Sequence, residues 1–261
     1  MNIRQEKICE LVKEKNFMSI MELSKQLHYS ESTVRRDLTV LENLKMIKRI
    51  SGGAMYVKEE HTEDPTEIKS RINSQQKSII ADLAIDFIAD HSTIFLDSSS
   101  TSQYIAKRLK DKKNLTIFTT NLSTADILDK QQNNHNIYFV GGKLSNGKVG
   151  GSCTEFLLRN VFFDQAFLSC RGISDEGYVS ELLEEEAMLK KIIRQQTREL
   201  FLVADEKKFG KSFTFTSFSL RDLDILITDT VSNEAIKQLI TKNNLNYYYN
   251  EWPILFINDF E

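Results

Sequence analysis

Between residues 78 and 229, amphipathic helical segments alternate with short apolar runs that are rich in β-branched residues. The runs that read as strands are STIFLD, LTIFTTN, NIYFVGG, QAFLSC, RELFLVAD and LDILITD. Strands that are separated by helices tend to pair in parallel and to be covered by helices on both faces. This alternation therefore predicts an α/β domain with a largely parallel sheet, which we place at residues 71–261.

The first 57 residues follow a different pattern. Residues 3–15 carry four apolar side chains at helical spacing, which are Ile3, Ile8, Leu11 and Val12. Ser19 and Ser30 are suited to cap a second and a third helix. The segment IKRISGGAMYV then reads as two short strands, because paired glycines tolerate the positive φ of a tight hairpin. This order predicts a winged helix-turn-helix over residues 1–57.

Residues 58–70, KEEHTEDPTEIKS, are charged, contain one of the two prolines and lack apolar periodicity, so we expect a linker there. The net charge of −3 is unevenly distributed along the chain. Residues 1–57 hold 10 Lys and Arg against 7 Asp and Glu, whereas the remainder is acidic. This is a mild basic bias of the small domain, which bears on its partner only if the basic residues share one face.

The sequence shows no signal peptide and no apolar run near the roughly 20 residues that span a bilayer, so we expect a cytoplasmic protein without a membrane partner. The three cysteines, Cys9, Cys153 and Cys170, lie far apart and indicate neither a disulfide framework nor a zinc site. The four histidines are scattered as well. We therefore expect no metal and no cofactor.

The third helix carries the residues that point to nucleic acid. Its core stripe is Val34, Leu38 and Leu41, so that Arg35 and Arg36 face away from the core. Arginine can bond guanine bidentately, hydroxyls reach bases or phosphates, and lysines on flanking elements hold the backbone. The predicted DNA-binding residues are Ser30, Ser32, Thr33, Arg35, Arg36, Thr39, Lys25, Lys48 and Arg49. The alternative is a solvated helix in which Asp37 and Glu42 are the local charge partners of the arginines.

The segment MSIMELSKQLHYSESTVRRDLTVLENLKMIKRISGGAMYV resembles the DNA-binding domain of the DeoR family of bacterial transcriptional regulators. The family pattern is S-x-x-T-[IV]-R-R-D-L, followed by a hairpin that ends in G-G-A. The matching residues are Ser30, Thr33, Val34, Arg35, Arg36, Asp37 and Leu38, then Gly52, Gly53 and Ala54. The resemblance implies that the arginine helix is a recognition helix for double-stranded operator DNA.

After the strand TIFLD comes a run of hydroxyl residues that leads into a helix, where backbone N–H groups favour a phosphate. The alternative is an over-provided helix cap. The run resembles the D-S-G-T-T-T of the DeoR effector domain, a Rossmann-like fold similar to sugar-phosphate isomerases and coenzyme A transferases. Ser99 replaces the glycine, so if that glycine uses positive φ or lets a phosphate approach closely in the family, the loop here must bend differently. The run consists of Asp97, Ser98, Ser99, Ser100, Thr101 and Ser102.

Further matches to the family lie along the second domain. They are Asn73 and Lys77, Thr120 and Asn121, Gly141 and Gly142, Val149 and Gly150, and the signature ADEKKFG with Asp205 and Lys208. Arg171 occupies a variable position that could contact a ligand. Glu186 and Lys190 lie at i, i+4 and are expected to pair with each other. The predicted effector-binding residues are the hydroxyl run of residues 97–102 with Asn121, Gly141, Gly142, Arg171, Lys190, Asp205 and Lys208.

The sequence thus predicts a repressor of a carbohydrate catabolic operon that a phosphorylated sugar relieves. One winged helix covers a half-site, so a homodimer or homotetramer is expected. We expect no enzyme, because no spacing marks Asp97, Asp205 or Glu186 as a catalytic base. Two alternatives stay open: an isomerase-like enzyme with a DNA-binding appendage, and a regulator whose second domain only forms oligomers.

Overall fold

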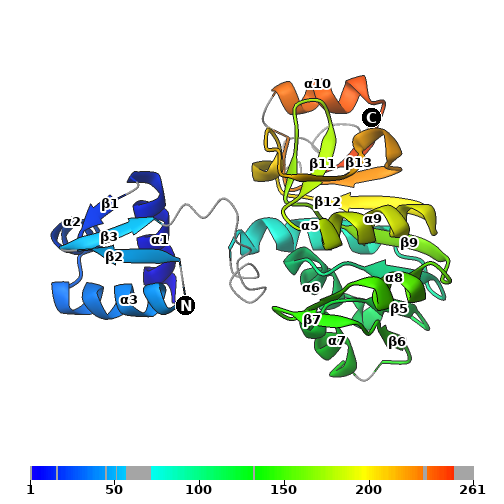
Figure 1. Ribbon diagram of the computed structural model, residues 1–261, viewed down its shortest axis with the longest axis horizontal. Helices are drawn as coiled ribbons and strands as arrows, with labels where there is room; N and C mark the ends of the chain where they lie inside the picture. Colours follow the sequence, from blue (N-terminus) through cyan, green and yellow to red (C-terminus); the bar gives the residue numbers. More distant parts are fainter. Residues whose placement is uncertain are drawn as a thin grey trace, which may run out of the picture. The chain divides into compact units, whose positions relative to one another are not determined.

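The computed structural model describes residues 2–15, 17–44, 46–50, 52–56, 72–131, 133–231 and 234–249. The chain divides into two compact units, residues 1–62 and 63–261 (Figure 1). The predicted linker at residues 58–70 and the hairpin residue Ser51 lie outside the described residues.

The first unit is a winged helix-turn-helix. Its elements are α1 (Ile3–Lys15), β1 (Phe17–Ser19), α2 (Ile20–Leu27), α3 (Glu31–Asn43), β2 (Ile47–Ile50) and β3 (Gly53–Tyr56). The strands form an antiparallel sheet in the order β1-β3-β2. Ser19 and Ser30 cap α2 and α3 as predicted. Ile3, which was predicted to belong to the apolar stripe, is 84% exposed because it starts α1, beyond the turn that contacts the core.

The second unit is built on a seven-stranded sheet, in which every pairing is parallel. The strand order is β15-β14-β12-β9-β4-β5-β6. In chain order the strands are β4 (Thr93–Leu96), β5 (Thr116–Thr119), β6 (Asn136–Phe139), β9 (Phe163–Leu168), β12 (Thr197–Val203), β14 (Ile225–Ile227) and β15 (Asn246–Tyr248). Six of them are the predicted apolar runs, and β15 was not predicted.

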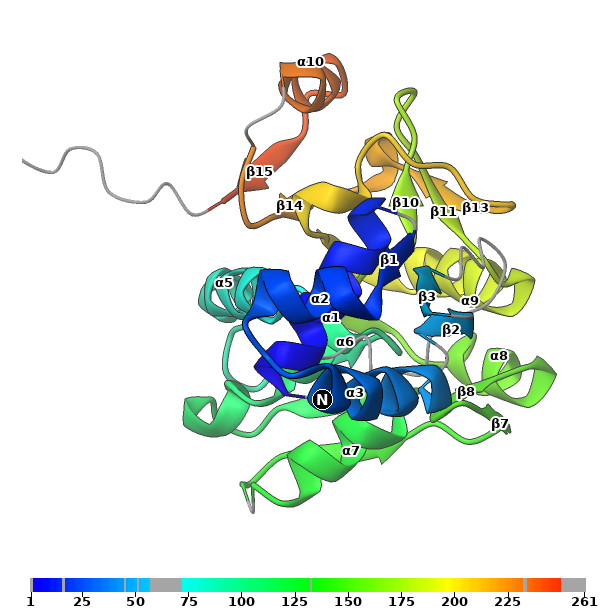
Figure 2. The same ribbon diagram turned by 90° about the vertical axis from the view of Figure 1, so that its left-hand side faces the viewer.

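Helices cover both faces of this sheet, as predicted. One apolar core packs α5 (Ser74–Phe87), α6 (Ser100–Ala106) and α7 (Leu122–Asp129) on one face. A second core packs α8 (Ser152–Leu158), α9 (Glu184–Gln195) and α10 (Glu234–Lys242) on the other. Figure 2 shows α5 on one side of the unit and α8 and α9 on the opposite side. No helix in the described part of the chain is long and apolar enough to cross a membrane.

Two smaller sheets join the second layer of helices. Strands β10 (Gly172–Ile173), β11 (Tyr178–Glu181) and β13 (Phe215–Ser219) form an antiparallel sheet, and β7 (Lys143–Ser145) pairs with β8 (Lys148–Gly150) in a hairpin. Three short 3-10 helices, Leu109–Asp111, Glu206–Lys208 and Leu220–Asp222, lie in the connections.

The order of the strands identifies one edge of the sheet as the place for a ligand. From β4 the chain proceeds to β5 and β6 on one side, and β9 then pairs with the other side of β4. In open parallel sheets, ligands bind at the carboxyl ends of the strands where the chain changes direction in this way. The residues that follow β4 and β9 therefore mark the expected binding region.

Candidate DNA-reading surface and effector site

Helix α3 presents its polar face to solvent. Val34, Leu38 and Leu41 are fully buried, as predicted. Arg35 and Arg36 are exposed, and the Arg35 side chain pairs with Glu31 of its own helix, with 3.2 Å between Nη2 and Oε2. No hydrogen bond or ion pair of the Arg36 side chain is found among the described residues. The Arg36 guanidinium is therefore available to a ligand that approaches from outside.

Asp37 is not a charge partner of these arginines, as the alternative required. Its carboxylate is buried and binds the guanidinium of Arg4 on α1, with a second bond of 3.2 Å from Arg4 Nη2. Gln5 Nε2 donates to it as well, at 2.8 Å. Arg4 also lies over the ring of Tyr29, in the turn before α3, at 4.7 Å from its centroid. Asp37 thus fastens α3 to α1 and leaves Arg35 and Arg36 to the outer face.

The wing adds basic residues next to this helix. Arg49 on β2 donates through Nη1 to Thr39 Oγ1 of α3 at 2.8 Å, and Glu42 accepts from the Arg49 backbone N–H at 2.9 Å. Lys48 on β2 and Lys25 on α2 are exposed. Contacts join Arg49 to α3, whereas no hydrogen bond or ion pair of the Lys25 or Lys48 side chain is found in the part of the chain that the structure describes.

The hydroxyl residues at the start of α3 bond with one another. Ser30 Oγ lies 2.9 Å from both Ser32 Oγ and Thr33 Oγ1, and it caps α3 by accepting from Thr33 N–H at 3.3 Å. Before them, His28 ends α2 in the left-handed region with φ of 57°. The tight turn places the start of α3 at the surface, where Ser30 and Ser32 are exposed.

In the second unit, Asp97 stands at the point where the chain changes direction. It follows β4, and its carboxylate accepts from the N–H of Ser169, which follows β9, at 2.7 Å. Ser99 N–H and Ser102 Oγ also donate to it, at 2.9 and 2.7 Å. Burial opposes its charge, but Lys190 and these hydrogen bonds outweigh that effect and lower the pKa of Asp97. Asp97 is therefore a buried anion that joins both halves of the sheet.

The replacement of glycine by Ser99 does not strain the loop. Ser99 has φ of −75° and ψ of 158°, an ordinary extended conformation. Its side chain caps α6 by accepting from the N–H of Ser102 at 3.1 Å. The serine at this position therefore does not require an unusual backbone conformation of the loop. Ser100, Thr101 and Ser102 are buried in the first turn of α6, whereas Ser98 and Ser99 are half-buried.

Lys190 on α9 is buried and contacts groups from three other elements. Its Nζ binds the carboxylate of Glu181 on β11, lies 3.9 Å from Asp97 Oδ2 and donates to the backbone carbonyl of Ser169 at 2.6 Å. Desolvation disfavours the ammonium, yet Glu181, Asp97 and Glu186 together raise the pKa of Lys190. Lys190 is therefore a fixed cation inside the site.

The predicted pairing of Glu186 with Lys190 is wrong. Glu186 Oε1 instead accepts from Lys148 Nζ, on the β7–β8 hairpin, at 2.6 Å. Lys190 binds Glu181 on β11 instead, a contact that sequence reasoning missed because it depends on the packing of α9 against β11. Burial raises the pKa of Glu181 to about 7, although Lys190 opposes the effect. This pKa places the titration of Glu181 near neutral pH.

The signature ADEKKFG supplies a second cation. Asp205 follows β12 and is buried, as predicted for the carboxyl edge of the sheet. Lys208 is half-buried and donates through Nζ to Ser169 Oγ at 2.6 Å. Asn73 Nδ2 lies 3.5 Å from Asp205 Oδ1. Ser169 therefore contacts Asp97, Lys190 and Lys208 together, a role that was not predicted from the sequence.

Asn121 supports the loop of residues 97–102. It follows β5, caps α7 by accepting from Thr124 N–H at 3.0 Å, and donates to the carbonyl of Ser98 at 2.8 Å. The carboxyl ends of β4, β5, β9 and β12 are thus joined by side chains. The polar constellation at these ends, which we call the switch-point site, consists of Asp97, Asn121, Ser169, Glu181, Lys190, Asp205 and Lys208.

Three predicted residues have other surroundings. The Gly141 carbonyl accepts from Thr154 Oγ1 at 2.9 Å. A side chain at Gly142 would collide with Thr154 and with the backbone of Gly150. The two glycines therefore have a packing role in the segment between β6 and β8. Arg171 is half-buried, with its guanidinium 5.6 Å from the ring centroid of Phe213. None of the contacts found in the described part of the chain links these residues to the switch-point site.

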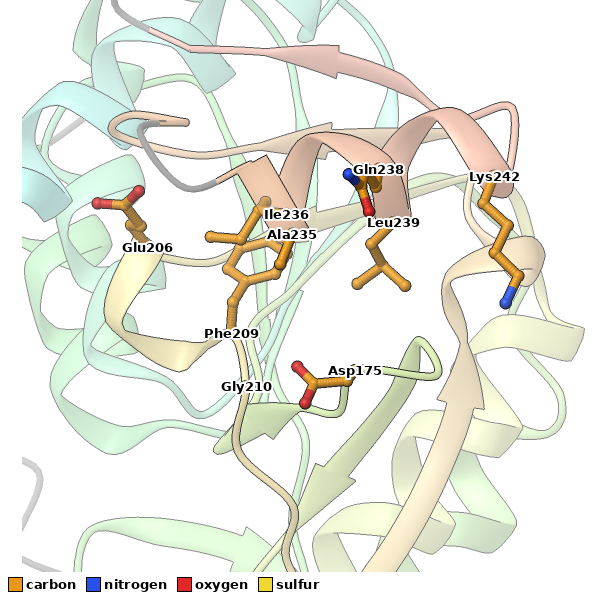
Figure 3. Close-up of a pocket in the computed structure, with 9 residues that line it drawn as sticks. All are labelled: Asp175, Glu206, Phe209, Gly210, Ala235, Ile236, Gln238, Leu239 and Lys242. Carbon is orange, nitrogen blue, oxygen red and sulfur yellow. The ribbon is translucent and has the colours of Figure 1, made fainter.

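A separate cavity of about 450 Å³ lies between α10 and the loop of residues 206–210 (Figure 3). Leu239 extends from α10 into the gap, and Asp175 faces it from the opposite wall. None of the predicted effector-binding residues lines this cavity, although it adjoins the ADEKKFG segment. The lining residues are Asp175, Glu206, Phe209, Gly210, Ala235, Ile236, Gln238, Leu239 and Lys242.

Comparisons with known proteins match both units. A model of the DeoR-like helix-turn-helix domain matches residues 4–60, and a model of the DeoR C terminal sensor domain matches residues 72–230. The HTH-type transcriptional regulator GolR of Listeria innocua is 34% identical over 89% of this chain and 92% of its own length. The HTH-type transcriptional repressor GlcR of Bacillus subtilis is 30% identical over 94% of each chain. The glycerol-3-phosphate regulon repressor of Escherichia coli is 29% identical over 93% and 96%.

Among solved structures, a D-ribose-5-phosphate isomerase in complex with phospho-erythronic acid aligns with a TM-score of 0.40 and 18% identity. The alignment covers 52% of this chain and 54% of the isomerase. A likeness this distant carries no argument about activity. The similar full-length relatives are named as regulators of transcription.

Proposed function

This chain belongs to the DeoR family of DNA-binding transcriptional regulators, and we propose that it represses a carbohydrate catabolic operon until a phosphorylated sugar binds its sensor domain. The observation that carries the proposal is the switch-point site, where two lysines, Lys190 and Lys208, meet on Ser169 at the carboxyl edge of the sheet. One relative is named for the glycerol-3-phosphate regulon, which is consistent with a phosphorylated effector.

Lys208 is the residue best suited to a phosphate. It is half-buried, and its partner Ser169 Oγ is a neutral hydroxyl, which a phosphate dianion would replace with a stronger acceptor. The first turn of α6 lies beside it, because Ser169 and Ser102 both donate to Asp97. The first N–H groups of a helix have no acceptors within the helix, and Ser99 occupies only that of Ser102. The phosphate is proposed to bind between Lys208 and this turn.

The carboxylates of the same site suit the sugar. Asp97, Glu181 and Asp205 are hydrogen-bond acceptors on neighbouring elements, and sugar hydroxyls donate to such groups. Hydroxyl recognition by these residues and phosphate recognition by Lys208 would together select a phosphorylated sugar over its unphosphorylated form.

Linkage then sets the direction of regulation. A sugar phosphate that releases DNA must bind the DNA-free arrangement more tightly, and DNA must weaken sugar-phosphate binding by the same factor. One winged helix reads a half-site, so we propose that the active form contains at least two chains.

We propose that the sensor domain has no catalytic activity of its own. An isomerase needs a base with a free lone pair beside the substrate carbon. The lowered pKa of Asp97 makes its carboxylate a weak proton acceptor, although its oxygens can still accept a hydrogen bond from a sugar hydroxyl. Product formation by the purified protein on a panel of sugar phosphates would contradict this part of the proposal.

The test is fluorescence anisotropy of the protein on its own upstream DNA, titrated with phosphorylated sugars and their unphosphorylated counterparts. We expect release by one phosphorylated sugar only. Lys208→Ala should bind DNA normally and fail to respond. Lys207→Ala is the matched control, because Lys207 is exposed and bonds Asn73 Oδ1 at 3.0 Å instead of Ser169. DNA binding that no compound of the panel changes would refute the effector proposal and leave DNA recognition intact.

A further inference from the structure

The switch-point site offers a phosphate little free positive charge. Its carboxylates are those of Asp97, Glu181 and Asp205, and its cations are Lys190 and Lys208. Lys190 is already bonded to Glu181 and lies 3.9 Å from Asp97. A phosphate group carries almost two negative charges, which nearby carboxylates repel. A further cation within reach of this site would therefore favour the proposed effector.

The strand order shows on which side of the site such a cation is missing. The loop of residues 97–102 follows β4, which pairs with β9 on one side and with β5 on the other. Lys208 approaches from the β9 side, where its Nζ bonds Ser169 Oγ at 2.6 Å. A lysine on the β5 side would place positive charge on both sides of the loop.

The β7–β8 hairpin brings a lysine to the β5 side. Leu122 N–H donates to the Gly147 carbonyl at 3.0 Å, and Val149 N–H donates to the Thr120 carbonyl at 2.8 Å. Lys148 lies between the two bonded residues of the hairpin. These bonds hold the backbone of Lys148 beside the carboxyl end of β5.

The ammonium group of Lys148 lies next to the loop of residues 97–102. Its Nζ donates to Glu186 Oε1 at 2.6 Å, and Ser98 Oγ lies 3.5 Å from the same oxygen. The side chains of Lys148 and Glu186 are 13% and 16% exposed, and Ser98 is half-buried. The three side chains therefore meet at a place that is open to solvent, where a ligand can contact them.

Glu186 keeps a neighbouring cation when Lys148 turns away. It is one of the carboxylates that raise the pKa of Lys190, so it lies in the field of that buried ammonium as well. A phosphate has three strong acceptor oxygens and more charge than a carboxylate, and lysine is a flexible point charge. An anion bound beside Ser98 would therefore attract Lys148 away from Glu186.

We propose that Lys148 is a specificity-determining residue of the effector site, which exchanges Glu186 for the phosphate of the effector. Lys148 and Lys208 then hold the phosphate from opposite sides of the loop of residues 97–102. The inference rests on the proposed function, because it concerns the phosphate of the same effector. A sugar acid, whose carboxylate carries a single negative charge, is expected to bind less tightly than a phosphorylated sugar.

The alternative is that the pair of Lys148 and Glu186 only fastens the hairpin to α9. Loss of either partner would then have the same effect on phosphate binding. If Lys148 binds the phosphate, the two losses act in opposite directions. Lys148→Met removes a phosphate-binding group, whereas Glu186→Gln removes the carboxylate that competes for Lys148. The sign of the Glu186→Gln effect therefore separates the two explanations.

The test is isothermal titration calorimetry of the full chain with inorganic phosphate, at one pH and one ionic strength. We expect Lys148→Met to weaken phosphate binding at least ~10-fold, as for the loss of one hydrogen bond between charged groups, and Glu186→Gln to strengthen it. Lys143→Met is the matched control, because Lys143 lies on the same hairpin and forms an exposed pair with Glu185 at 3.0 Å. Its phosphate affinity should equal that of the unaltered chain.

Three results would overturn the proposal. One is unchanged phosphate affinity in Lys148→Met, and another is weaker binding by similar factors in Lys148→Met and Glu186→Gln. Either leaves the proposed function standing if Lys208→Ala abolishes phosphate binding. The third is no phosphate binding by the unaltered chain, which would reject the phosphate site of the proposed function as well. Glu186→Gln keeps every lysine and the size of the side chain, so its effect can be measured even if Lys148→Met does not fold.

Discussion

The two functional regions of this protein handle charge in opposite ways. On α3, Arg36 stands in solvent and has no partner among the described residues. At the switch-point site, Asp97, Lys190 and Asp205 are each less than a tenth exposed and bonded to other elements. The first region is ready for a ligand that arrives from outside, whereas the second must exchange internal contacts to accept one.

This difference has consequences for stability. An exposed arginine keeps its water in the folded and the unfolded chain, so its removal should change DNA affinity and little else. A buried ion keeps its charge only through its partners, and removing one partner leaves the others uncompensated. Substitutions at the two regions should therefore separate cleanly into changes of binding and changes of folding.

The largest effect is expected from Lys190→Met. The substitution keeps the length of the side chain but leaves Asp97 and Glu181 buried without their cation. We expect a loss of about 3–5 kcal/mol in the free energy of unfolding, measured by urea denaturation followed by circular dichroism. The substitution should leave α3 unchanged. At temperatures where its sensor domain is still folded, Lys190→Met should therefore bind DNA with the affinity of the unaltered protein.

Lys130→Met is the matched control for this prediction. Lys130 lies on the surface and pairs with Asp126 at i, i+4. Such exposed pairs contribute about 0.3–0.5 kcal/mol. If Lys190→Met and Lys130→Met cost the same, the buried charge network has no special role, and the contrast between the two regions fails.

The next effect concerns pH. The pKa of Glu181 is about 7 in the folded protein and 4.5 in its ordinary environment, so the folded state binds more protons between these values. The contribution of Glu181 to the free energy of unfolding is fully present below pH 4.5 and is lost as the pH rises to about 7. At about 1.4 kcal/mol per pKa unit, this loss is at most about 3 kcal/mol. The side chain of Glu181→Gln cannot ionise. The free energy of unfolding of this variant, measured by urea denaturation at several pH values, should therefore increase relative to that of the unaltered protein across this range.

Two observations would contradict the pH prediction. One is an equal slope of stability against pH for Glu181→Gln and the unaltered protein. The other is loss of the slope in Glu184→Gln, whose side chain is exposed at the start of the same helix that carries Lys190. Asp97 contributes with the opposite sign, because its pKa is lowered, and the comparison of variant with parent removes its contribution.

A smaller effect is expected on the exposed side of the comparison. Arg36→Ala should weaken specific DNA binding by about 1–3 kcal/mol, because a base-reading contact is lost, and weaken nonspecific binding less. The free energy of unfolding should stay within about 0.5 kcal/mol. Fluorescence anisotropy on operator and on scrambled DNA, at one salt concentration, measures the two DNA affinities. Arg198→Ala in the sensor domain is the control. Equal losses on both DNAs would show that Arg36 touches only phosphate.

The sequence was sufficient to predict which face of α3 is exposed. The apolar spacing of Val34, Leu38 and Leu41 predicted the buried side of α3. The helical period of 3.6 residues then predicted that the arginines lie on the exposed side. The resemblance to the DeoR family is confirmed by the matches to both units. Six strands of the large sheet are confirmed as well, because buried parallel strands read as continuous apolar runs.

The buried region was predicted less completely, because its contacts are not local. Ser169 and Glu181 were missed, since a serine after one strand and a glutamate on a short polar strand carry no signal until the fold brings them to Lys190. The expected pair of Glu186 and Lys190 failed because the packing of α9 against other elements sets their partners: Glu186 binds Lys148, 38 residues away, and Lys190 binds Glu181 on β11. The short strands β11 and β13, rich in Ser and Thr, were not predicted either.

The smallest effect is expected at Ser99, which is half-buried and donates its backbone N–H to Asp97 at 2.9 Å. Its φ of −75° suits any residue, and its hydroxyl caps α6. Ser99→Ala should therefore cost about 1 kcal/mol of unfolding free energy, and Ser99→Gly only a few tenths, because glycine is tolerated at the cap. Thermal unfolding of the three proteins measures both, and the sugar-phosphate response should survive in each. A variant that keeps its stability but loses the response would mean that the Ser99 hydroxyl contacts the effector directly, and the departure from glycine would then be a determinant of which sugar this protein reads.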